Sequence, residues 1–181
     1  MDREFRYIIL SIALFKVVLR VTGFVFYNNL VAYKNRALNA SAQIDIQLKR
    51  RYDLILNIVE VAKKYLTHEQ ETLTQVIEAR NSAKGVLDSI ANNPNAITQL
   101  NAAEKTLQNA LMNFQMTMEA YPNLKADTLM KSLTEELTST ENKVAFARQG
   151  YNDNVTHFNI YKQSFPNNLI AGFFAKFYIQ G

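Results

Sequence analysis

The scarcity of chain-breaking residues constrains this fold more than any other feature of the sequence. Only 5 Gly and 3 Pro occur among 181 residues, whereas an all-β fold needs many turns that these residues supply. Residues 28–50 contain neither, so we expect a helix that begins before them to continue through them. From there to residue 165, apolar side chains recur three or four positions apart, which is the period of an amphipathic helix.

A long apolar segment occupies residues 7–27. Sixteen of its 21 residues are apolar and none is acidic. As a helix it is about 30 Å long, which matches the hydrocarbon thickness of a bilayer. We expect it to span a membrane, and the alternative is an amphipathic helix that lies in the membrane interface.

Two cations, Lys16 and Arg20, interrupt this segment. The 13 Ile, Leu, Phe and Val residues contribute about −6 kcal/mol to insertion, and the two cations cost about +5 to +7 kcal/mol, so the sum is near zero. Lys16 and Arg20 are four positions apart and share a face with Gly23 and Tyr27. We expect this narrow polar stripe to face another protein helix or lipid headgroups.

Further helices follow the apolar segment. Turn residues at 91–95 and at Tyr121-Pro122 separate them, and Asp127 is a candidate cap for the last one. Short links between long helices imply antiparallel neighbours. The sequence predicts an all-α fold, an N-terminal membrane helix continuing into an antiparallel up-down four-helix bundle. The predicted later helices cover residues 52–90, 96–120 and about 127–165.

The predicted organisation has three parts: a membrane anchor (residues 1–27), a bundle (28–165) and a short amphipathic C-terminal segment (166–181). With four alternating helices, the C-terminal segment returns to the membrane. It is too short to span but suits an interfacial anchor, and packing on the bundle end or on a partner subunit is an equal alternative. Its candidate contacts with membrane or oligomer are Phe173, Phe174 and Phe177.

Charge is distributed unevenly along the chain. Residues 1–64 carry 11 Lys/Arg and 5 Asp/Glu, whereas residues 65–181 carry 9 and 11. A basic N-terminal part beside an apolar segment favours an anionic membrane surface over nucleic acid as a partner. Lys49, Arg50 and Arg51 form a basic run that could contact phosphate groups or an acidic partner, and solvated or paired charges are the alternative.

A polar network inside the bundle is a further hypothesis. Glu141, Asn142 and Arg148 lie on the most polar part of the last helix, and Glu141 and Arg148 share a face because they are seven positions apart. Together with Asp45 or Arg51 from other helices, they could form a network that sets the register of the bundle.

The residues of metal and covalent chemistry are scarce. No Cys is present, which excludes disulfides, thiol catalysis and Cys-ligated metals. His68 and His157 both lack a second ligand at zinc or di-iron spacing, and no Gly pair has the spacing of a phosphate loop. We therefore expect no catalytic activity, no metal and no cofactor.

Several motifs resemble the LemA family of bacterial membrane proteins, in order and spacing and over nearly the whole chain. The resemblance implies a single-pass protein of the bacterial inner membrane whose bundle faces the cytoplasm. One branch of that family takes part in magnetosome membrane formation, which implies membrane organisation. Leu56 departs from the family, which usually has Pro at this position. The motifs are YNNLVAYKNRA (27–37), QIDIQLKRRYDL (43–54), KYLTHEQETLTQVIEAR (64–80), YPNLKA (121–126), TENKVAFARQGYND (140–153) and FNIYKQSFPNNLIAGFF (158–174).

Two functional hypotheses follow. The first is a membrane-anchored scaffold or interaction protein that forms a homo-oligomer, helped by the stripe at Lys16 and Arg20, with membrane lipid and other membrane proteins as further partners. The second is an adaptor or regulator of a membrane enzyme such as a protease or sensor.

Overall fold

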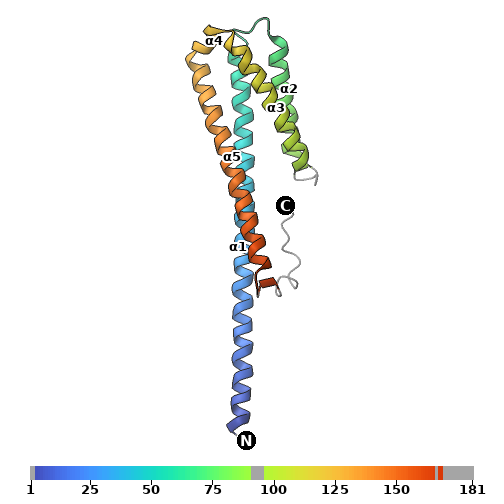
Figure 1. Ribbon diagram of the computed structural model, residues 1–181, viewed down its shortest axis with the longest axis vertical. Coiled ribbons are helices and arrows are strands. Elements are labelled where there is room, and N and C mark those ends of the chain that lie inside the picture. The colour runs from blue at the N-terminus through green and yellow to red at the C-terminus, as the bar shows by residue number, and fades with distance from the viewer. Residues whose placement is uncertain (1–2, 91–95, 166, 169–181) are drawn as a thin grey trace. The chain divides into compact units, whose positions relative to one another are not determined.

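The computed structural model describes residues 3–90, 96–165 and 167–168, and those residues form helices and short connections (Figure 1). No strand lies among them, which confirms the predicted all-α fold. The turn predicted at residues 91–95 lies outside this part. The helices are α1 (Arg3–Ala62), α2 (Gln70–Ser89), α3 (Ala96–Glu119), α4 (Pro122–Ala126) and α5 (Thr128–Gln163).

The chain forms two compact units, which we name unit 1 (Met1–Ala42 and Ala147–Gly181) and unit 2 (Gln43–Phe146). Both α1 and α5 contribute residues to each unit. α1 is a single helix that passes residue 27 without a break. The continuation of the first helix through residues 28–50 is confirmed.

The prediction of one helix over residues 52–90 is wrong. α1 continues to Ala62, and residues 63–69 connect it to α2. The connection begins with two tight backbone hydrogen bonds, in which the amides of Tyr65 and Leu66 donate to the Ala62 carbonyl, each at 2.9 Å. Leu66 is fully buried in the core, so the apolar pattern continues through the connection and conceals it.

Unit 2 holds the larger apolar core. Within it, α2 and α3 pack side by side, and α1, α2, α3 and α5 follow one another in alternating directions, as expected for an up-down bundle (Figure 1). Burial of these side chains supplies the main stabilising free energy of the unit. Its largest fully buried apolar side chains are Tyr52, Leu48, Ile55, Leu66, Leu73, Leu107, Leu124, Met130 and Val59.

Unit 1 is held by an aromatic contact between α1 and α5. Phe26 and Leu30 on α1 pack against Phe158 on α5, and all three are about 1% exposed. The ring of Tyr161 stacks on Phe26, with centroids 5.5 Å apart and planes 13° apart. The Asn29 amide donates to the Tyr161 hydroxyl at 3.2 Å, so this contact combines apolar packing with a polar tether.

Asp127 caps the N-terminus of α5, as predicted. Its Oδ1 accepts a hydrogen bond from the backbone N–H of Met130 at 2.9 Å, and its Oδ2 accepts one from the Tyr65 hydroxyl at 2.7 Å. These two bonds favour the ionised carboxylate and hold the pKa of Asp127 below its ordinary value. The hydrogen bond from the Tyr65 hydroxyl to Asp127 raises the pKa of Tyr65. Asp127 therefore fastens the start of α5 to the connection that follows α1.

We expect Asp127→Ala to lower the thermal unfolding midpoint at neutral pH, because α5 loses its cap and Tyr65 loses its acceptor. The pKa of Asp127 is lowered by folding, so its stabilisation is complete above the unfolded-state pKa and is lost as the pH falls through the folded-state pKa. The difference from wild type should shrink in acid, as measured by far-ultraviolet circular dichroism of the full chain in detergent.

The matched control is Asp153→Ala, which removes an exposed carboxylate from α5 and should leave the midpoint nearly unchanged. A destabilisation by Asp127→Ala that is independent of pH would contradict the assignment.

Candidate functional site

The first candidate surface is the N-terminal part of α1, between Arg6 and Val25. By length and composition, this helix is apolar enough to cross a membrane. A continuous apolar surface of this extent is typical of a site that contacts a membrane or another protein. Twelve large apolar side chains on it are each 50–68% exposed: Tyr7, Ile8, Ile9, Leu10, Ile12, Leu14, Phe15, Val17, Val18, Val21, Phe24 and Val25.

Two hydroxyl groups on this surface are satisfied by the helix itself. The Ser11 hydroxyl donates to the Ile8 carbonyl and the Thr22 hydroxyl donates to the Val18 carbonyl, each at 2.8 Å. Such local bonds let hydroxyl groups enter an apolar environment at low cost. Lys16 and Arg20 also lie on this surface.

Lys16 and Arg20 are both exposed and lie one helical turn apart. We name this pair the basic stripe. Within the described part of the chain, neither cation has an ion-pair or hydrogen-bond partner. The other predicted membrane contacts, Phe173, Phe174 and Phe177, lie outside the described residues, so their contact with membrane stays a prediction.

A buried arginine lies at the centre of unit 2. Arg51 Nη1 forms an ion pair with Glu104 Oε2 on α3 at 2.6 Å, and both side chains are less than 10% exposed. Arg51 Nη2 reaches Glu141 Oε1 on α5 at 3.0 Å. The Tyr52 hydroxyl donates to Glu104 Oε1 at 2.6 Å. We name these four residues the arginine network, because they join α1, α3 and α5: Arg51 and Glu104 are buried, whereas the Glu141 side chain is 43% exposed.

A second buried arginine joins α2 to the same turn of α1. Arg80 Nε donates to the backbone carbonyl of Tyr52 at 3.1 Å, and its Nη2 lies 3.4 Å from Asp53 Oδ1. Its Nη1 donates to Asn81 Oδ1 at 3.0 Å. Residues 51–53 therefore carry polar contacts to all three long helices that surround α1 in unit 2.

Of the residues expected in a polar network, Glu141 and Arg51 form an ion pair. Asp45 instead pairs with Lys49 on its own helix at 2.9 Å. Asn142 is exposed, and Arg148 is half-buried in unit 1.

Sequence reasoning missed Glu104 and Tyr52. Glu104 interrupts an otherwise apolar row on α3, between Leu100 and Leu107, and this interruption is the signal that could have identified it. A carboxylate inside an apolar helix face needs a buried partner, and Arg51 provides one.

Each cation of the basic run at 49–51 forms an ion pair with a carboxylate of the same chain. Lys49 pairs with Asp45, Arg50 with Glu136 and Arg51 with Glu104. Arg51 is only 7% exposed, which agrees with the alternative of paired charges. Lys49 and Arg50 remain exposed, and their contact with a partner stays a prediction.

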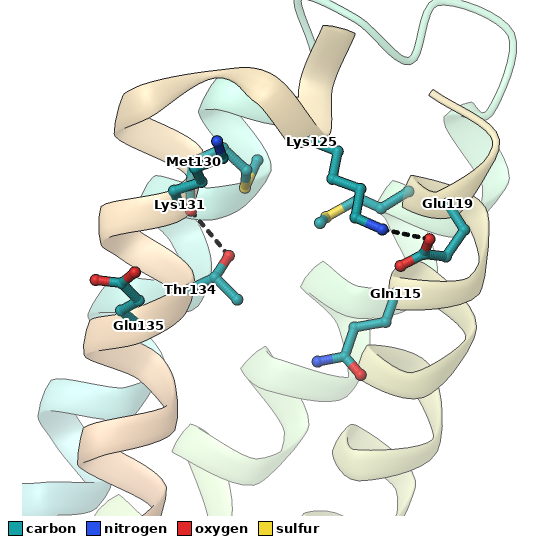
Figure 2. A pocket seen from close by; sticks show the side chains of 8 residues that line it. Gln115, Glu119, Lys125, Met130, Lys131, Thr134 and Glu135 are labelled. Carbon is teal, nitrogen blue, oxygen red and sulfur yellow. Dashed lines mark hydrogen bonds and ion pairs between the residues drawn. The ribbon is translucent and has the colours of Figure 1, made fainter. Parts of the chain in front are cut away.

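An open groove lies between α3, α4 and α5 in unit 2, with a volume of about 380 Å³. Figure 2 shows Gln115 and Glu119 on one side, Met130, Lys131, Thr134 and Glu135 on the other, and Lys125 between them. Lys125 is paired with Glu119 at 2.5 Å. Within the described residues, no group of three or more His, Cys, Asp or Glu side chains gathers to hold a metal ion.

Comparison with known proteins agrees with the sequence motifs. The sequence model of the LemA family matches residues 40–178. The protein LemA of Metamycoplasma hominis is 28% identical over 144 residues, which cover 80% of this chain and 63% of that protein. The predicted resemblance is confirmed. The match begins at residue 40 and so leaves the apolar segment outside it.

We expect Arg51→Met to lower the free energy of unfolding by about 3–5 kcal/mol, because it leaves Glu104 buried without a cation. The double variant Arg51→Met/Glu104→Leu should recover most of this loss, since both charges are then replaced by apolar groups. Urea unfolding of the full chain in detergent, followed by circular dichroism, measures these values.

Arg50→Met is the matched control, because Arg50 is the neighbouring arginine in a half-exposed pair. Its loss should be about 1 kcal/mol or less. Equal losses for the two arginine variants would contradict the importance of the arginine network.

Proposed function

The chain belongs to the LemA family, and we propose that it is a membrane-anchored helical scaffold, which binds partners with its bundle and acts without catalysis. The observation that carries this proposal is the exposed apolar surface of α1, where twelve large apolar side chains face outward. In water this surface would be strongly unfavourable, whereas in a bilayer the lipid tails cover it.

The continuity of α1 supports a spanning position over an interfacial one. Residues 7–27 and residues 28–42 belong to one helix, without a turn or a proline between them. If residues 7–27 cross the bilayer, the helix carries the residues that follow straight out of the membrane. A helix lying flat would instead hold residues 28–42 and the packed end of α5 against the headgroups.

The bundle supports the scaffold part of the proposal. Its buried polar side chains make contacts between helices: Arg51 on α1 pairs with Glu104 on α3, and Arg80 on α2 donates to the Tyr52 carbonyl on α1. Buried ionic contacts of this kind favour a single helix register, which gives a bundle with a defined surface for partners.

The position of the anchor can be tested directly, because the chain has no cysteine. We expect Asp2→Cys to react with a membrane-impermeant maleimide in bacterial spheroplasts, and Asn39→Cys to react only after lysis. This result corresponds to a spanning helix in the inner membrane with a cytoplasmic bundle.

Equal labelling of both cysteines on the same side would contradict a spanning helix and favour an interfacial one. Labelling of Asn39→Cys alone in spheroplasts would keep the spanning helix but reverse the orientation.

A second candidate function, an adaptor for a membrane enzyme, is favoured by the basic stripe. The sequence contains no Asp or Glu between residues 5 and 44, so a parallel second copy offers no carboxylate to Lys16 and Arg20. A different membrane protein can supply one.

Mass determination of the full chain in mild detergent separates the two functions. The scaffold function predicts a discrete homo-oligomer, in which identical copies associate through the same surface. A monomer would contradict self-assembly and leave the adaptor function.

A further inference from the structure

We propose that Lys16 and Arg20 pair, within the membrane, with a carboxylate on a transmembrane helix of a different protein. The proposal names the partner of the basic stripe, and it rests on the membrane position proposed above for residues 7–27. Its main observations are the exposure of both cations and the sequence composition around them.

The depth of the two cations argues for a protein partner over lipid headgroups. Lys16 is nine residues from Tyr7, or about 13 Å along the helix, and Arg20 is about 10 Å from Tyr27. Side chains on a helix tilt toward its N-terminus, so Arg20 points away from the nearer end of the segment. Both cations therefore lie in the middle of the segment, whereas phosphate groups lie at its ends.

The contrast with the hydroxyl groups strengthens this argument. Ser11 and Thr22 satisfy their hydrogen bonds within the helix, but a Lys or Arg side chain needs an external acceptor. Charged groups at mid-membrane depth are costly and usually pair with groups on neighbouring helices. Lys16 and Arg20 therefore need an acceptor that the described residues do not supply.

Charge complementarity selects the partner. With no acidic residue between positions 5 and 44, a parallel copy would place cations against cations, which is repulsive. A helix with an Asp or Glu at the depth of residues 16–20 offsets one of the two positive charges and gains charge-assisted hydrogen bonds from the cations.

Gly23 is consistent with close approach of such a helix. It lies on the face of the basic stripe, and a Cβ added there would meet nothing within 4 Å. Packing within the chain therefore does not require glycine at this position, although glycine weakens a helix. Small residues at helix contacts in membranes let two backbones approach.

The test uses the full chain labelled through Asn39→Cys and reconstituted in phosphatidylcholine vesicles. The probe is a labelled Leu-rich transmembrane peptide of about 20 residues with one central Asp, compared with the same peptide carrying Leu there. We expect energy transfer to show about tenfold or more tighter association with the Asp peptide. Lys16→Leu/Arg20→Leu should abolish the difference, whereas the control Arg6→Leu should keep it.

Equal association with both peptides, or a difference that survives Lys16→Leu/Arg20→Leu, would overturn the proposal. Transfer between labelled copies without peptide, abolished by the same double variant, would assign the stripe to a second copy and would also overturn it. The proposal would also be overturned if the double variant changed only the association of the chain with vesicles that contain added phosphatidylglycerol. Vesicle flotation separates the two proposals: a chain that does not float contradicts the membrane anchor, and one that floats without Asp-dependent transfer contradicts only this inference.

Discussion

Two consecutive residues of α1, Arg51 and Tyr52, connect every long helix of unit 2. Arg51 pairs with Glu104 on α3 and Glu141 on α5, and the Tyr52 carbonyl accepts a hydrogen bond from Arg80 on α2. A buried charge is tolerated only when its partners are in place, so we expect these contacts to favour one register of the helices. The apolar core packs around this arrangement, and its side chains can interlock only when the register is correct.

The same helix has opposite surroundings at its two ends. Near its C-terminal end, α1 buries apolar residues such as Leu48 and Ile55 in the core of unit 2. Near its N-terminal end, Leu14 and Phe24 are more than 60% exposed. Apolar residues that face outward at one end and inward at the other point to two different environments. This contrast, more than any single motif, supports a membrane anchor joined to a helical interaction module.

The sequence predicted most of the helices because their ends carry local signals. α3 matches its predicted span closely, since Tyr121-Pro122 follows it, and Asp127 begins α5 through a local cap. The connection at residues 63–69 was missed because it contains no Gly or Pro and places Leu66 in the core. In the predicted polar network, Glu141 does pair with Arg51. Glu104 was not anticipated, because its pairing with Arg51 depends on how α3 packs against α1.

The sequence by itself determined the all-α class, the apolar segment, the basic stripe and the family. These are properties of composition, of helical period and of short motifs, and they do not depend on which helices meet. Only the tertiary structure decided where α1 ends and that Arg51 is buried while Arg50, its neighbour, stays half-exposed. The physical reason is that the energy of a buried charge depends on its partners, and those partners are brought near Arg51 by the packing of α3 and α5.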